Sequence, residues 1–146
     1  MKSTSRKAII RISLLMVFTL IASGTMMFIF AGNNDSLEAR LANMNVTTIS
    51  NVARGARTVT AGNALVITGA GRVEGNISVM PGALLVVQGN VNADRAVQGR
   101  VLLNGGDFYL VSGNIWNTAG AQSPAVAINN GSNFTMQGGN IRATMH

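Results

Sequence analysis

Short apolar runs, separated by glycine and asparagine, recur along the second half of this chain. Within the runs the apolar positions alternate, as in Phe108 and Leu110 and again in Phe134 and Met136. Alternation is the periodicity of a strand that turns one face inward. From residue 46 onward no stretch has a helical spacing of apolar residues. The pattern therefore predicts an all-β domain of short strands.

A glycine–polar–aliphatic step punctuates these runs and recurs at intervals of 18, 24 and 26 residues. The four occurrences are Gly71-Arg72-Val73, Gly89-Asn90-Val91, Gly113-Asn114-Ile115 and Gly139-Asn140-Ile141. The last two units agree at a constant offset of 26, and an offset of 24 aligns Leu84 and Val86 with Phe108 and Leu110. Equivalent units at fixed offsets are typical of a stack of coils.

We therefore predict a short parallel β-helix of about four coils over residues 58–146, with each coil about 4.8 Å above the last. Glycine, asparagine and Pro81 supply its corners. Such stacking would align three asparagines in a ladder and two phenylalanines in the interior: Asn90, Asn114 and Asn140, and Phe108 over Phe134. An antiparallel sandwich is the alternative fold, but it does not explain the fixed offsets.

The segment GSNFTMQGGNI, from Gly131 to Ile141, resembles the repeats of bacterial right-handed β-helix surface proteins of the pectate-lyase-like superfamily. The resemblance extends over about residues 58–146 and implies right-handed coils. That superfamily includes polysaccharide lyases and hydrolases, adhesins and inert stalks. The segment GRVEGNI, from Gly71 to Ile77, resembles bactofilins, which are polymer-forming β-helix proteins. Bactofilins have shorter, more uniform coils and a cytoplasmic domain, so the long steps and the N-terminal charges count against this second resemblance.

Residues 12–31 form an uncharged, mostly apolar stretch of about 20 residues, which is long enough to span a bilayer as a helix. Four cations precede it: Lys2, Arg6, Lys7 and Arg11. Because positive residues stay in the cytoplasm, the chain beyond residue 31 is expected on the outer side of a bacterial membrane. The length favours a retained anchor. A signal peptide cleaved near Ala22-Ser23-Gly24, which would release the rest as a secreted protein, is the alternative.

A short amphipathic helix is expected over residues 36–44. Asp35 and Glu38 match a capping box, and Leu37, Leu41 and Met44 share one face. We expect this helix to cover the first coil as a cap, because an open coil end exposes apolar core. A juxtamembrane linker helix is the alternative. The predicted organisation is an anchor or signal at 1–31, a linker with this helix and the first strand at 32–57, and the β-helix at 58–146.

The net charge of +6 does not indicate a nucleic-acid-binding face. Four of the cations precede residue 12, and beyond residue 31 seven scattered arginines stand against five acids. The chain contains no cysteine, which excludes disulfides, thiol catalysis and cysteine-based metal sites. We expect no cofactor and no nucleic-acid partner.

The acidic residues do not form a catalytic pattern. Glu74, Asp94 and Asp107 are expected in different coils, without the paired spacing of a glycosidase. The single histidine is His146, the last residue. We therefore expect a non-enzymatic protein, with a polysaccharide lyase or hydrolase as the alternative.

Two longer connections, residues 92–99 and 117–125, are predicted to follow the same corner and to project from one side of the stack. Loops on one side of a solenoid commonly carry recognition. The candidates for glycan contact are Asp94, Arg95, Arg100, Tyr109 and Trp116. The alternative is that these are solvated loop residues and that Trp116 has a packing role.

The sequence favours a membrane-anchored or exported β-helix module for surface display, or for binding a glycan or another partner. No polar helix or charged strand covers the last coil, so we also expect self-association through open coil ends or a chain that is a fragment of a longer repeat protein. A bactofilin-like self-assembling scaffold is the further alternative.

Overall fold

The computed structural model describes residues 18–20, 26–28, 35–89, 95–118 and 123–144. The chain divides into two compact units, residues 1–43 and residues 44–146.

The described part of the apolar stretch 12–31 forms two short strands. Strand β1 (Phe18–Leu20) pairs antiparallel with β2 (Met26–Phe28), whereas the sequence predicted a single helix there. The periodicity of a continuous apolar run does not distinguish a helix from a strand, so the pattern alone did not determine that this stretch is helical. Among the described residues no helix is long and apolar enough to cross a membrane. The rest of this stretch lies outside the described residues.

The expected amphipathic helix is present as α2 (Asp35–Ala42). Leu37 and Leu41 are both buried, as a shared apolar face requires. The helix ends at Ala42, two residues before the expected end. The backbone N–H of Asn43 donates to the Arg40 carbonyl (3.1 Å), and its Nδ2 donates to the Ala39 carbonyl (2.8 Å). These bonds satisfy carbonyls of the last turn that have no partner within the helix. The role of α2 as a cap on the first coil stays a prediction.

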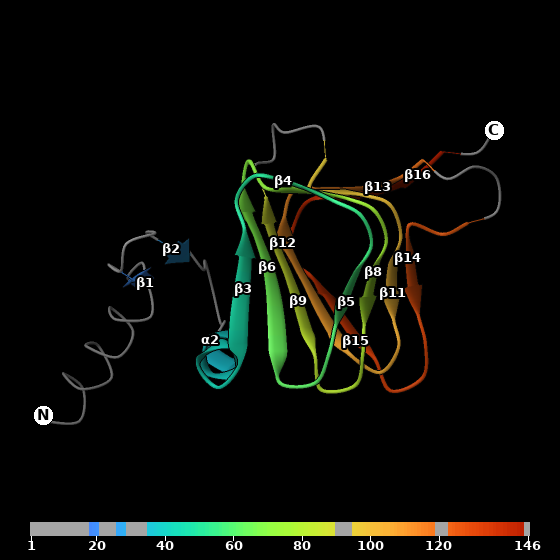
Figure 1. Ribbon diagram of the computed structural model, residues 1–146. Coiled ribbons are helices and arrows are strands. Elements are labelled where there is room, and N and C mark those ends of the chain that lie inside the picture. Colours follow the sequence, from blue (N-terminus) through green and yellow to red (C-terminus); the bar gives the residue numbers. More distant parts are fainter. Residues whose placement is uncertain (1–17, 21–25, 29–34, 90–94, 119–122, 145–146) are drawn as a thin grey trace, which may run out of the picture. The chain divides into compact units, whose positions relative to one another are not determined.

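The second unit is a parallel β-solenoid with three sheets (Figure 1). The first sheet contains β3 (Asn45–Ile49), β6 (Asn63–Gly69), β9 (Leu84–Gly89), β12 (Asp107–Ser112) and β15 (Asn133–Met136). The second sheet contains β4 (Val52–Arg54), β7 (Arg72–Glu74), β10 (Val97–Gln98), β13 (Asn114–Asn117) and β16 (Asn140–Ala143). The third sheet contains β5 (Arg57–Val59), β8 (Ile77–Val79), β11 (Val101–Leu103) and β14 (Val126–Ile128).

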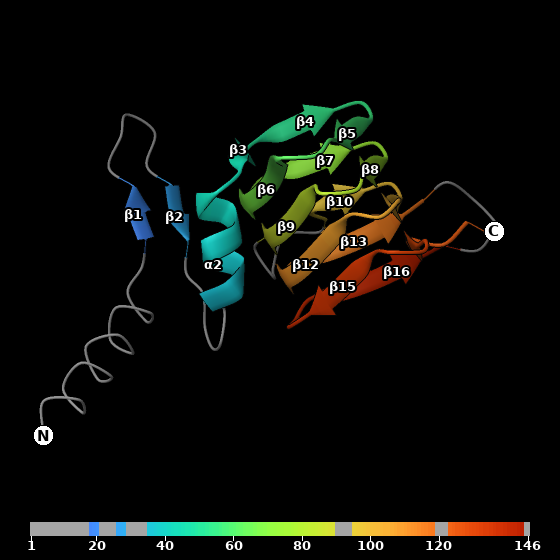
Figure 2. The same ribbon diagram turned by 90° about the horizontal axis from the view of Figure 1, so that it is seen from below.

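Each coil contributes one strand to each sheet, which gives four complete coils and two strands of a fifth in the described part of the chain (Figure 2). Every strand pair of this unit is parallel. The parallel β-helix prediction is therefore confirmed at the level of a solenoid of about four coils, and the antiparallel sandwich is wrong.

Aligned side chains from successive coils fill the interior. In the first sheet one inward row runs through Leu65, Leu85, Phe108 and Phe134. The rings of Phe108 and Phe134 are stacked as predicted, with centroids 5.0 Å apart. Phe108 is fully buried. Each fully buried aliphatic or phenylalanine side chain stabilises the fold by about 1.5–3 kcal/mol, so a narrow core of such rows suffices.

The register of the third coil differs from the prediction. Leu85 pairs with Phe108 and Val87 with Leu110, in place of the expected Leu84 and Val86. The pairing of β9 with β12 is shifted by one residue from the prediction. An irregularity between Leu110 and Ser112 returns the pairing to the predicted offset of 24, because Gln88 pairs with Ser112. The reason is that β9 is apolar at successive positions and is buried on both faces, so alternation does not identify its inward side.

The strand predicted at the Gly89 step forms further along the chain. Val97 pairs with Val73 on one side and with Ile115 on the other. Residues 90–94 lie outside the described residues. Additional residues between β9 and β10 separate β10 from Gly89. The recurrence of the tripeptide does not reveal this separation.

The two long connections consequently follow different corners, which corrects the prediction of a shared one. The connection from β9 to β10 joins the first sheet to the second, and the connection from β13 to β14 joins the second sheet to the third. The second sheet therefore has a long connection at each of its two sides.

Backbone conformation and close backbone contacts explain why glycine occupies two of the corners. Gly113 and Gly139 have φ values of 99° and 86°, and a Cβ on Gly139 would lie 2.2 Å from the Gly113 carbonyl oxygen. Only glycine accommodates both conditions. Beside them Asn140 Nδ2 donates to Asn114 Oδ1 at 3.0 Å, which confirms this pair of the predicted ladder. Asn90 lies outside the described residues.

Candidate functional site on the outer face of the second sheet

The strands of the second sheet turn one residue inward and its neighbours outward. The register places one residue from each coil in a single line on the outer face, which we call the outer row. It consists of Arg54, Glu74, Gln98, Trp116 and Arg142. Successive members are one strand spacing apart, about 4.8 Å. The outer row thus runs along the solenoid axis.

Trp116 lies between two arginines. The Arg95 Cζ is 4.0 Å from the centroid of the Trp116 ring, and the Arg142 Cζ is 5.5 Å from it. The indole Nε1 donates to Thr144 Oγ1 at 2.7 Å, which fixes the orientation of the ring. Guanidinium groups at these distances are attracted by the negative face of an indole. The arrangement connects three successive coils.

At the other end of the outer row, Glu74 is paired with two arginines. Arg54 Nε lies 3.3 Å from Glu74 Oε2, and Arg72 Nη2 contacts Glu74 Oε1. The Arg54 side chain is 86% exposed, so its pair contributes at most about 1 kcal/mol to stability. With Arg95 and Arg142, the described outer face of the second sheet carries four arginines and one carboxylate.

Donor groups remain available on this face. Arg95 and Arg142 make no ion pair or side-chain hydrogen bond with any residue that the structure describes. The Nε atoms of Arg72 and Arg95 are covered yet have no acceptor among those residues. A guanidinium has five N–H donors, whose planar arrangement matches carboxylate, sulfate or phosphate oxygens. Arg95 and Arg142 can therefore bind anionic oxygens through N–H donors that no described residue uses.

Of the five residues that the sequence nominated, the structure brings Arg95 and Trp116 together. Arg100 lies at the corner between β10 and β11, where its backbone N–H donates to Asn76 Oδ1 (3.0 Å). Tyr109 belongs to β12 of the first sheet, paired with Val86 and Thr135, and so lies on another face. Asp94 lies outside the described residues.

Sequence reasoning missed the other cations of this face, namely Arg54, Arg72 and Arg142. The sequence did contain a signal that could have identified Arg142. The residue after the aliphatic position of each step is Glu74 in the first, Trp116 in the third and Arg142 in the fourth, and each of these faces outward. Reading the repeat position by position, including its polar positions, would have placed these residues in line.

Asn117 was also missed, and it supports the long connection beside the outer row. Its side chain is almost completely buried, and its Nδ2 donates to the Ser123 carbonyl at 2.9 Å. A buried amide needs such partners, because an unpaired one costs about 1–3 kcal/mol. Asn117 thereby ties the end of the connection from β13 to β14 to the last residue of β13.

The acids in the described part of the chain are separately engaged. Glu74 is paired with arginines as above, whereas Asp107 Oδ1, on the first sheet, accepts from Asn133 Nδ2 at 2.8 Å. Residues 35–89, 95–118 and 123–144 hold no group of three or more His, Cys, Asp or Glu side chains that could bind a metal.

Comparison of the chain with protein-family models, with curated proteins and with solved structures gives no match. The evidence for the solenoid architecture is therefore its strand pairing, and the evidence for the candidate site is its geometry.

Proposed function

We propose that this chain is a non-enzymatic β-helix module of a bacterial envelope, and that it binds an anionic polysaccharide along the outer face of the second sheet. The observation that carries the proposal is the stack of Arg95, Trp116 and Arg142. The resemblance to right-handed β-helix surface proteins supports the same reading and a right-handed winding of the coils.

A linear polyanion suits this face for a geometric reason. The outer row presents one side chain per coil at intervals of about 4.8 Å, so an extended chain can contact several coils at once. Each additional contact is then intramolecular and raises the affinity without requiring a strong single site. Guanidinium groups bind carboxylate or sulfate in a bidentate manner, and the indole adds an apolar contact for a sugar ring.

A polysaccharide is proposed as a ligand and not as a substrate. Glycoside hydrolysis uses two carboxyl groups on either side of the scissile bond. Glu74, the carboxylate within the outer row, is already paired with Arg54 and Arg72. No observation in the described residues favours the lyase alternative.

Binding is tested by calorimetry with the full chain in a mild detergent, using polygalacturonate as the anionic probe and dextran as the neutral one. Charge-assisted hydrogen bonds contribute about 1.5–3 kcal/mol each. We therefore expect Arg95→Gln and Arg142→Gln each to weaken binding by about tenfold or more, while Arg40→Gln on α2 leaves it unchanged. Equal affinity for dextran, an equal effect of Arg40→Gln, or no binding of the anionic probe would reject the proposal, and preferential binding of duplex DNA would assign the face to nucleic acid.

We further propose that residues 12–31 hold the module at a membrane. Their length and apolar character and the four preceding cations support this. The full chain should stay in the membrane pellet after alkaline carbonate washing, and deletion of residues 1–31 should release it. A mature N-terminus at or just after residues 22–24 would instead establish the cleaved signal peptide.

A further inference from the structure

The two ends of the solenoid differ in the polarity of their inward positions. In the third sheet one inward row consists of Arg57, Ile77, Val101 and Val126, so the first coil has a cation where the later coils have aliphatic residues. In the first sheet Thr47 occupies the row that continues with Leu65 and Leu85. The first coil is therefore polar at two positions that are apolar elsewhere.

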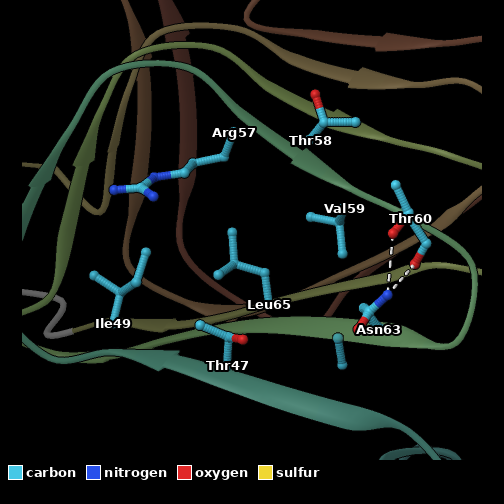
Figure 3. A pocket seen from close by; sticks show the side chains of 9 residues that line it. Thr47, Ile49, Arg57, Thr58, Val59, Thr60, Asn63 and Leu65 are labelled. Atoms are coloured by element: carbon cyan, nitrogen blue, oxygen red, sulfur yellow. Dashed lines mark hydrogen bonds between the residues drawn. The ribbon is translucent and has the colours of Figure 1, made fainter.

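Arg57 lies beside a cavity in the first coil. A cavity of about 510 Å³ is lined by residues of β3, β5 and β6 and of the turn between β5 and β6. Figure 3 shows Arg57 extending over the cavity that Ile49, Val59 and Leu65 line. The Arg57 guanidinium makes no ion pair or hydrogen bond with any residue in the described part of the chain.

At the C-terminal end of the solenoid the inward positions are apolar. Ile128, Met136 and Ile141 continue the inward rows, yet they are 53%, 47% and 38% exposed. Within β14, β15 and β16 the charged residue is Arg142, which belongs to the outer row beside Trp116. This end thus combines exposed apolar side chains with the outer edges of three sheets, which are surfaces that favour strand association.

We propose that two copies of the chain associate through their C-terminal ends, tail to tail, and that Arg57 keeps the N-terminal end from stacking. Head-to-tail stacking would bury Arg57 in line with the aliphatic row of the third sheet. An unpaired buried charge costs several kcal/mol, and the strands β14, β15 and β16 contain no carboxylate to offset it. The inward positions of these three strands carry no charge. A second C-terminal end presents matching apolar residues and strand edges.

Tail-to-tail contact has two-fold symmetry, so it closes at a dimer and does not propagate into a filament. The proposal rests on the ends of the solenoid and not on the outer face of the second sheet. Its test is therefore independent of polysaccharide binding.

The first test is the oligomeric state of the full chain in detergent solution, measured by sedimentation equilibrium. We expect a dimer that Met136→Glu and Ile141→Glu each convert to monomer, with circular dichroism confirming that both remain folded. Val52→Glu is the matched control, because Val52 is 51% exposed but belongs to the first coil. A chain that is monomeric at all concentrations, or a dimer lost equally with Val52→Glu, would overturn the proposal.

The second test determines which ends meet. The chain contains no cysteine, so single cysteines can be placed without background. Ala61 and Asn130 are exposed and lie in turns that lead into the first sheet, one in the first coil and one in the last. With a bis-maleimide, Asn130→Cys should cross-link to itself and Ala61→Cys should remain uncross-linked. Cross-links that appear only when the two variants are mixed would establish head-to-tail stacking and exclude our arrangement.

The third test removes the charge. Arg57→Leu, combined with Thr47→Leu, makes both rows of the first coil aliphatic. We expect species larger than a dimer to appear with increasing concentration, whereas Arg57→Lys should remain dimeric. A double-leucine variant that stays dimeric would show that Arg57 does not control the N-terminal end.

Discussion

At the scale of the residue, Trp116 shows how this solenoid uses an aromatic side chain outside its core. The chain has one tryptophan, and it lies outward between Arg95 and Arg142 while its neighbour Ile115 fills the interior. The Nε1 bond to Thr144 extends from the fourth coil to the fifth. Trp116 therefore belongs to the candidate ligand face and also forms a hydrogen bond with the last coil.

The bond between Trp116 and Thr144 can be isolated by a double-mutant cycle. Trp116→Phe and Thr144→Val each remove it, and a hydrogen bond of this kind is worth about 0.5–1.5 kcal/mol net. Because the two residues share one interaction, the double variant should lose clearly less stability than the sum of the single variants. Urea unfolding measures these values, and strictly additive losses would show that the bond contributes nothing.

Gly71 offers a second test at this scale. A Cβ there would lie 2.1 Å from the Ile49 carbonyl oxygen, which is backbone and not free to move aside. Gly71→Ala should therefore destabilise the fold by at least about 1–3 kcal/mol, a typical cost of stored backbone strain. The control is Gly69→Asn, because Gly69 has a φ of 55° with open space around it and asparagine tolerates that conformation. Similar unfolding midpoints for the two variants would contradict the close approach at Gly71.

At the scale of the element, the short strands depend on their neighbours for register. Strand β10 contains only Val97 and Gln98, yet it is paired on both sides, with β7 and with β13. Val97 is fully buried and Gln98 is half-buried on the outer row. Two adjacent residues of one strand thus face opposite environments.

This difference can be tested directly. Val97→Asp would place a carboxylate in the interior without a partner, and such substitutions belong to the most destabilising class, beyond about 4 kcal/mol. Gln98→Asp puts the same group on the half-exposed outer face, opposite Glu74 of the second coil, where repulsion between two like charges costs about 1 kcal/mol or less. Thermal unfolding distinguishes the two. Comparable losses would mean that β10 is paired in another register.

The sequence predicted the elements better than their alignment. The recurring glycine steps predicted the stacked coils, the pair Phe108 and Phe134, and the contact between Asn114 and Asn140. They failed at the third coil, because β9 is apolar on both faces and the chain before Val97 carries extra residues. Trp116 and Arg95 were nominated from their residue types. Arg142 occupies the same repeat position as Trp116, so the repeat could have placed it, whereas Arg54 lies outside the four glycine steps and joins this face only through the register between coils.

At the scale of the whole molecule, each coil contacts only the coils next to it. Stability in such a stack is close to a sum of coil and interface contributions. The first coil has a solenoid neighbour on one side, and its strands β4 and β5 are largely exposed, whereas β8 and β11 are half-buried or buried throughout. The first coil is therefore expected to open before the central coils.

Hydrogen exchange followed by mass spectrometry checks this expectation. Peptides covering β4 and β5 should exchange faster than peptides covering β8 and β11, because local opening there breaks fewer buried contacts. The central coils should exchange together, near the rate of global unfolding. Uniform protection from the first coil to the fourth would contradict the neighbour-by-neighbour account.

One corner of the stack accommodates very different lengths of chain. Between the second and third sheets the link is Gly99 and Arg100 in one coil and residues 118–125 in the next, yet Val101 and Val126 still pair. Additional sequence at this corner thus leaves the pairing of the strands on either side unchanged. Natural variation or a grafted peptide could lengthen this bend without any compensating change in the buried rows, so new surface chemistry can be acquired here by insertion alone.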